Sequence, residues 1–203
     1  MESKYGQSQV KLIFILGLLF LLGCSKAHKT ENKVQLPDDV RSGDIICRLG
    51  NGFFSSKFKS YSIEEKLYSH VGIAWLSNDS VFVIHAEASE LTGVGHVKRE
   101  YISDFLNEIK IWGVYRLEES DSISTRIAEN ANCYYLRNTP FDLEFDAMND
   151  DEVYCTELVA NAVNKSLGDS LIKPNLVLGD KSLYTIDGVY LLPRIRVVQK
   201  IVN

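Results

Sequence analysis

Two strand-like segments joined by a turn constrain the fold more than any other feature of this chain. Residues 68–75 (YSHVGIAW) and 81–87 (VFVIHAE) are rich in β-branched and aromatic residues, which favour β-strands. Residues 77–80 (SNDS) between them have a turn composition, so we expect an antiparallel hairpin. His70 lies at the start of the first strand and His85 near the end of the second. The hairpin should therefore bring two imidazoles close together.

A cysteine opens an expected helix further along the chain, in residues 150–160 (DDEVYCTELVA). Apolar residues recur there at helical spacing, namely Val153, Leu158, Val159, Ala162 and Val163. We expect Cys155 in the first turn, with Asp150 or Asp151 as the N-cap. The helix dipole should lower the pKa of such a thiol. An isolated cysteine is more often a small buried residue, but two upstream histidines favour a nucleophile.

The order of histidine, second polar residue and late cysteine resembles the circularly permuted papain-like hydrolases of the NlpC type, in particular their YiiX group. It is also similar to the lecithin:retinol acyltransferase family. The matching segments are residues 42–46 (SGDII), 69–72 (SHVG), 83–86 (VIHA), 140–142 (PFD) and 154–158 (YCTEL). The resemblance implies an α+β fold, a permuted papain-like antiparallel sheet with the nucleophile helix packed against it. It also implies Cys155 as nucleophile, His70 as base and His85 as the third, orienting residue.

Two positions depart from that pattern. The YiiX group often carries a carboxylate where this chain has His85, and a small residue usually follows the cysteine where this chain has Thr156. Glu87 shares the strand parity of His85, so both side chains should face the same side of the sheet. Glu87 is therefore the alternative orienting residue.

The remaining elements follow from residue patterns. We expect strands at 44–49, 70–76, 81–87, 94–99, 110–117, 189–192 and 194–202, and helices at 101–107, 122–137 and 155–167. Strands gathered in the middle of the chain with helices at their flanks predict an α+β layer, and not alternating βαβ units.

The N-terminal sequence is typical of a targeting segment. Residues 12–22 are almost wholly apolar, which is shorter than the roughly 20 residues needed to cross a bilayer. The following LLGC at 21–24 resembles a bacterial lipobox, in which the cysteine is acylated after cleavage. We therefore expect a signal peptide at 1–23, a lipidated Cys24 with a flexible tether at 24–39, and the hydrolase domain at 40–203. An uncleaved anchor or an ordinary signal peptide is the alternative.

These expectations place the protein in the bacterial cell envelope, bound to the membrane through its lipid anchor. Ser25 favours the outer membrane if the organism follows the enterobacterial sorting rule. If Cys24 is lipidated, three of the four cysteines remain, an odd number. We expect Cys47 and Cys133 to be buried thiols, although a disulfide bridge remains open.

The composition of the chain limits the classes of function that it can have. A chain of 203 residues with 45% hydrophobic content suits one folded core, and a net charge of −5 argues against a nucleic-acid partner. We expect a thiol hydrolase or acyltransferase that acts on an amide or ester of a small peptide or lipid-like substrate, without a cofactor. One alternative is a catalytically idle lipoprotein that binds a cell-wall or lipid fragment. A zinc site of His70, His85 and Cys155 is another, but it lacks a local ligand pair, and we expect no metal.

Overall fold

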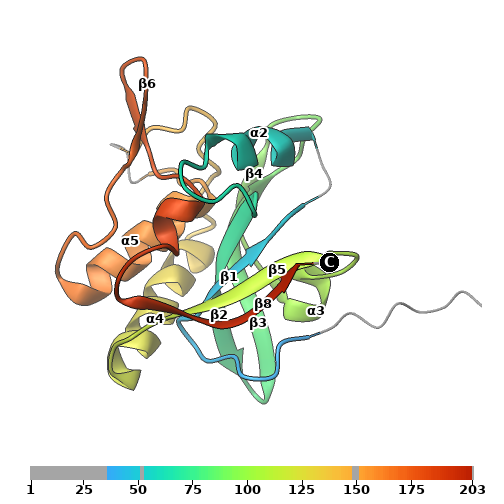
Figure 1. Ribbon diagram of the computed structural model, residues 1–203, viewed down its shortest axis with the longest axis vertical. Coiled ribbons are helices and arrows are strands. Elements are labelled where there is room, and N and C mark those ends of the chain that lie inside the picture. Colours follow the sequence, from blue (N-terminus) through green and yellow to red (C-terminus); the bar gives the residue numbers. More distant parts are fainter. Residues whose placement is uncertain (1–35, 51–52, 148–150, 203) are drawn as a thin grey trace, which may run out of the picture. The chain divides into compact units, whose positions relative to one another are not determined.

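A six-stranded antiparallel sheet organises the described part of the chain (Figure 1). The structure is a computed structural model that describes residues 36–50, 53–147 and 151–202. The sheet has the order β4-β3-β2-β1-β5-β8. Its strands are β1 (Ile45–Arg48), β2 (His70–Ser77), β3 (Ser80–Ala88), β4 (Gly95–Tyr101), β5 (Ile111–Leu117) and β8 (Ile195–Val202). The helices are α2 (Phe53–Tyr61), α3 (Ile102–Phe105), α4 (Asp121–Leu136) and α5 (Cys155–Leu167).

The expected hairpin is confirmed. Strands β2 and β3 pair from Ile73 opposite Ile84 to Ser77 opposite Ser80. The two turn residues between them, Asn78 and Asp79, have φ values of 48° and 58°. Positive φ at both central positions is the mark of a type I′ turn, whose twist matches that of the flanking strands.

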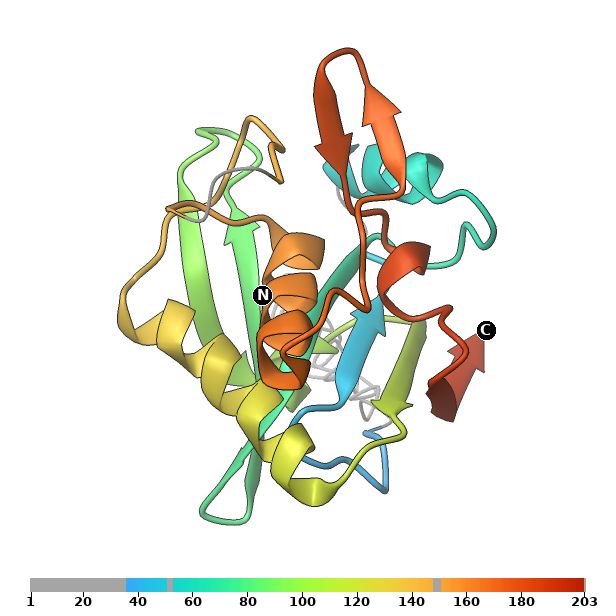
Figure 2. The ribbon, with the colours of Figure 1, turned by 90° about the vertical axis from the view of Figure 1, so that its left-hand side faces the viewer.

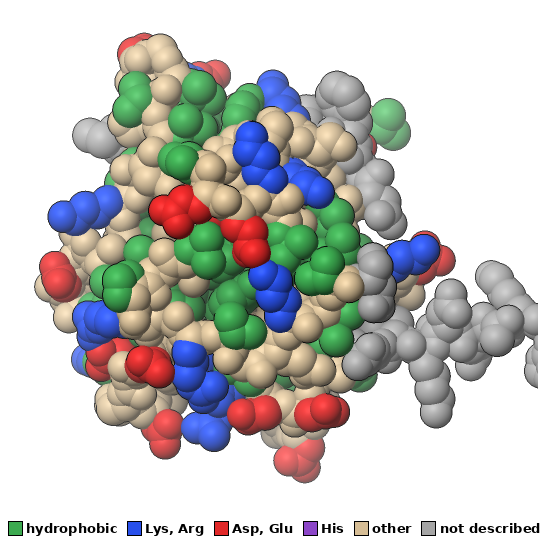
Figure 3. Space-filling model, in the orientation of Figure 1, with side chains coloured by type: hydrophobic (Ala, Val, Ile, Leu, Met, Phe, Trp, Pro, Cys, Tyr) green, Lys and Arg blue, Asp and Glu red, His purple; other side chains and the backbone are tan. Residues whose placement is uncertain are grey.

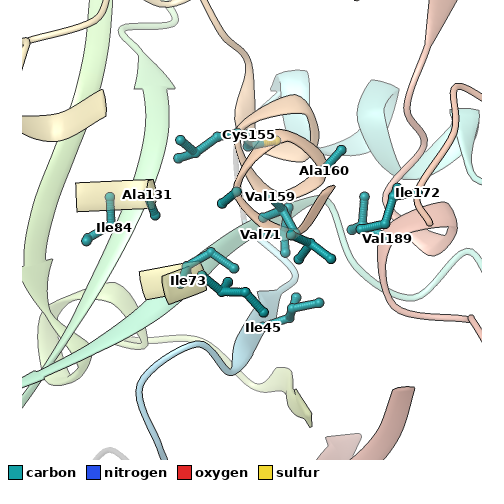
Figure 4. Close-up of a cluster of buried hydrophobic side chains, with 14 of the residues drawn as sticks. Ile45, Val71, Ile73, Ile84, Ala131, Cys155, Val159, Ala160, Ile172 and Val189 are labelled. Atoms are coloured by element: carbon teal, nitrogen blue, oxygen red, sulfur yellow. The ribbon is translucent and has the colours of Figure 1, made fainter. Parts of the chain in front are cut away.

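The two faces of the sheet carry separate cores, because side chains alternate along each strand. On one face Cys47, Val71 and Ile73 pack with residues of α4 and α5. On the other face Ile46 and Ala74 pack with residues of α3. Figure 2 shows α4 and α5 together against the first face, and Figure 4 shows their buried side chains above the strands. The α+β class, with an antiparallel sheet and the helix that begins at Cys155 packed against it, is thus confirmed.

One expected strand is wrong, and one hairpin was not expected. Residues 189–192 do not form a strand, since Asp187–Val189 is a 3-10 helix and the chain then turns towards β8. A small hairpin of β6 (Leu176–Leu178) and β7 (Lys181–Leu183) was not expected. The signal peptide, Cys24 and most of the tether lie outside the described residues. Within the described ranges, no helix is long and apolar enough to cross a bilayer.

Charged side chains of both signs are interspersed on the face shown in Figure 3, with hydrophobic side chains between them. Cys47 and Cys133 are free thiols, as expected. Cys47 is fully buried, but Cys133 is only partly buried, so the expectation of a buried Cys133 is wrong.

Candidate active site

Cys155 is the first residue of α5, and its side chain is only 4% exposed. The N-cap is Tyr154 and not Asp150 or Asp151, so the expected cap is wrong. Glu157 Oε2 lies 3.3 Å from the Tyr154 nitrogen and accepts its N–H, which satisfies a donor at the helix start. The thiol therefore sits at the N-terminal end of α5, above the β2 residues Val71 and Ile73 (Figure 4).

The two histidines meet as the hairpin predicts. His70 Nε2 lies 2.7 Å from His85 Nδ1, and the two rings are edge to face at 4.9 Å between centroids. Phe105 of α3 packs on both rings. The His85 side chain is completely buried, so it can contact other protein groups but not solvent.

One cavity of about 360 Å³ is lined by both His70 and Cys155. Side chains alternate between the two faces of the sheet along β2, so the His70 side chain points to the face that packs against Phe105. Cys155 begins α5, which packs on the other face. The cavity reaches both residues because His70 is the first residue of β2, at the end of the sheet where α5 also begins. The backbone N–H of Val71, the residue after His70, hydrogen-bonds the Cys155 thiol.

The expectation of a low thiol pKa is wrong. Burial raises the pKa of Cys155 to about 12, and the N–H groups of Val71, Thr156 and Cys155 itself lower it by less. Burial also lowers the pKa of His70 well below its usual range, and nearby His85, Arg48 and Lys98 lower it further. The resting pair is therefore a neutral thiol and a neutral imidazole.

Glu87 does not bond to His70 in the structure. Its carboxylate lies 2.8 Å from Arg48 Nη2 and 2.5 Å from Lys98 Nζ. Arg48 in turn stacks over Phe105 and donates to the Phe105 carbonyl oxygen. Glu87 and Arg48 both line the cavity, so this ion pair forms part of its wall.

Sequence reasoning missed one residue of this cluster. Glu100 Oε1 lies 2.9 Å from His85 Nε2, the ring nitrogen that faces away from His70. We expected the strand at 94–99 to end before Glu100. Nothing in the sequence around Glu100 distinguishes it from the other glutamates of the chain. Only the register of β3 against β4, with Val83 opposite Glu100, brings its carboxylate to His85.

The rest of the cavity wall is largely aromatic and aliphatic. Its apolar lining residues include Phe58, Ile109, Phe141, Leu143 and Phe145. These side chains come from α2 and from loops, so their convergence could not be foreseen from strand and helix patterns.

Residues 39–183 match the family described as permuted papain-like amidase enzymes, YaeF/YiiX, of the C92 family. The chain belongs to this family. A crystal structure of the metalloprotein YiiX from Escherichia coli O157:H7 has a similar fold, with a TM-score of 0.64 and 20% sequence identity. The match covers 79% of this chain and 97% of that one. No curated protein matches the sequence. The family is one of amidases, which supports a cysteine hydrolase here.

Three side chains of the site are close enough together to be considered as metal ligands. Among the described residues, His70, His85 and Glu87 have potential ligand atoms within 4.8 Å of one another. Both His85 nitrogens already bond to protein groups, His70 and Glu100. Two nitrogens on one tetrahedral zinc, each at about 2.0–2.1 Å, are about 3.4 Å apart, whereas the facing nitrogens of His70 and His85 are 2.7 Å apart. The residues as arranged do not fit a shared metal.

Proposed function

We propose that the protein hydrolyses an amide or ester bond through Cys155, His70 and His85. The observation that supports this most directly is the 2.7 Å contact of His70 with His85 beside a cavity that Cys155 also lines. Nucleophile, base and orienting residue are thus drawn from α5, β2 and β3. Membership in an amidase family favours this hydrolase over a catalytically idle lipoprotein.

Because the thiol and the imidazole are both neutral at rest, attack and proton transfer occur together. His70 accepts the thiol proton while the sulfur bonds to the substrate carbonyl carbon. Backbone N–H groups at the start of α5, including that of Cys155, are suited to stabilise the oxyanion. His70 then gives the proton to the leaving amine or alcohol, and a thioester to Cys155 remains.

Water completes the reaction. His70 takes a proton from the water as its oxygen attacks the thioester carbonyl, and the proton passes to the sulfur as the C–S bond breaks. The products are a carboxylic acid and the free thiol. If an alcohol or amine takes the place of water, the same intermediate gives acyl transfer.

The cavity favours a substrate with an apolar group next to the scissile bond. Phe58, Phe141 and Phe145 supply an aromatic wall, while Arg48 and Glu87 neutralise each other on another part of the lining. An acyl chain or an apolar peptide side chain would satisfy this wall. Peptide and lipid-like substrates both contain such groups, so assays must include both.

Trapping the intermediate tests the proposal. The purified domain is mixed with a panel of muropeptides, acyl esters and N-acyl p-nitroanilides, quenched in acid, and examined by intact mass. We expect the mass of one acyl group on Cys155 with at least one substrate, and none with Cys155→Ala. Turnover by Cys155→Ala equal to that of the wild type would refute the thiol mechanism.

We also propose that Cys24 is lipidated and holds the domain at the bacterial envelope, on the outer membrane. The support is the LLGC pattern at residues 21–24 after an apolar segment, followed by a polar stretch. This location would present the cavity to peptides and lipids of the envelope.

A further inference from the structure

We propose that Glu100 is a positioning residue that holds His85, and through it His70, in the one tautomer that can accept the Cys155 proton. This inference rests on the proposed function. It is carried by two consecutive contacts, from Glu100 Oε1 to His85 Nε2 at 2.9 Å and from His85 Nδ1 to His70 Nε2 at 2.7 Å.

The first contact determines which nitrogen of His85 carries the proton. Burial acts to raise the pKa of Glu100, but the hydrogen bond from His85 lowers it, and the nearby cations Lys98 and Arg48 lower it further, to about 2. The carboxylate is therefore ionised and can only accept. His85 is completely buried, and burial lowers its pKa, which favours the neutral ring. A neutral ring has one N–H, and Glu100 requires it at Nε2.

The second contact passes this choice to His70. With its proton at Nε2, His85 presents a lone pair at Nδ1. His70 Nε2 lies 2.7 Å from that lone pair and must donate, so His70 carries its own proton at Nε2. The lone pair of His70 is then at Nδ1, the nitrogen left to receive a thiol proton. In the opposite tautomer Nδ1 would carry an N–H, and His70 would have no lone pair free to accept a proton.

The surrounding charges explain why Glu100 contributes by orienting His85 more than by adding a negative charge to the site. Lys98 Nζ lies 3.5 Å from Glu100 and 2.5 Å from Glu87, and Glu87 pairs with Arg48 at 2.8 Å. These two cations and two carboxylates balance one another beside the histidines. Lys98 lies beside both carboxylates and offsets part of their charge, whereas the hydrogen bond of Glu100 is directed to one nitrogen of His85.

The test compares Glu100→Ala with Glu100→Gln. An amide oxygen can still accept from His85 Nε2, so Glu100→Gln keeps the tautomer, whereas Glu100→Ala releases it. Glu118→Gln is the matched control, because it removes an equal charge from an exposed position beyond the far end of β5.

The first readout is the tautomeric state of His70 and His85, from long-range ¹H–¹⁵N NMR of the full domain, with assignments from His70→Gln and His85→Gln. We expect single Nε2–H tautomers in the wild type, Glu100→Gln and Glu118→Gln, and mixed tautomers in Glu100→Ala. A single tautomer retained in Glu100→Ala would overturn the proposal.

The second readout is turnover of an N-acyl p-nitroanilide. Loss of one charge-assisted hydrogen bond should lower kcat of Glu100→Ala by about 10- to 100-fold with little change in KM, while Glu100→Gln keeps most of its activity. Equal losses in the Ala and Gln variants would show a merely structural ion pair and overturn the proposal. The NMR result does not need turnover. Mixed tautomers in Glu100→Ala, with a wild type that cleaves no amide or ester, would refute the proposed function and support the positioning role.

Discussion

His70 and His85 should contribute unequally to catalysis. We expect His70→Ala to lower kcat/KM as far as Cys155→Ala does, by about 10³-fold or more, because the members of a catalytic unit are not additive. His85→Ala should leave a measurable remainder, and His85→Gln or His85→Glu should restore part of the loss by accepting from His70 Nε2. Steady-state assays measure all five, with Cys133→Ala as the control for loss of a cysteine. Full activity in His70→Ala would contradict the assignment of the base.

The pH dependence follows from the buried imidazole. Because burial lowers the pKa of His70 below its usual 6.5, the base stays neutral down to moderately acidic pH. We expect kcat/KM to be level from about pH 6.5 to 8 and to fall only at lower pH, as His70 becomes protonated. Removing a nearby cation in Lys98→Met should move the acidic limb to higher pH. An acidic limb of the wild type above pH 6.5 would show that His70 is more solvated than the structure has it.

At the residue scale, the sequence supports the choice of Cys155, His70 and His85 because strand and helix patterns place them at element ends. It could not reveal their protonation. The thiol at a helix start suggested a low pKa, but burial outweighs the backbone N–H groups and raises it. Glu100 was missed for a related reason, since its role depends on a pairing register between two strands.

At the scale of elements, Gly72 of β2 is required where β2 meets β3. A Cβ at this position would lie 2.6 Å from Val83 Cγ1, 2.8 Å from the Ile84 carbonyl oxygen and 2.9 Å from His85 Cβ. We expect Gly72→Ala to destabilise the fold by about 1–3 kcal/mol. It should also lower the activity of the folded fraction, because His85 must move. Urea unfolding and active-site titration measure the two effects.

Gly168→Ala is the control for that variant. Gly168 ends α5 with φ of 66°, and no atom lies within 4 Å of an added Cβ. Its cost should be about 1 kcal/mol from backbone strain alone, without loss of activity per folded molecule. If both glycine variants keep equal specific activity, the close packing of Gly72 does not position His85.

Most elements of the sheet and its helices could be predicted because their patterns are strong. The I′ turn at Asn78 and Asp79 and the apolar spacing of α5 are local signals. The β6–β7 hairpin has only three residues in each strand, with Val177 and Leu178 exposed, so no alternation marks it. Residues 189–192 are apolar, and Val189 and Tyr190 are buried in the core. A short buried segment has the same apolar composition as a strand even when it pairs with none, so the sequence pattern predicted a strand there.

At the scale of the whole molecule, attachment to a membrane depends on one residue outside the described ranges. We expect Cys24→Ser to abolish detergent-phase partitioning of the protein expressed in a bacterial host, while circular dichroism and melting of the domain stay unchanged. Cys133→Ser should partition like the wild type. A wild type that stays in the aqueous phase would contradict the lipoprotein assignment.

The chain order of this sheet also determines when chemistry becomes available during synthesis. His70, His85 and Glu100 all precede α5, so a ribosome adds the two histidines and the glutamate before it adds Cys155. Until α5 has emerged and packed on β2, the growing polypeptide holds the proposed base without the proposed nucleophile, so the proposed reaction cannot begin. A fragment released before residue 155 should therefore lack the proposed activity, whereas in a papain-like enzyme of unpermuted order the nucleophilic cysteine would emerge first.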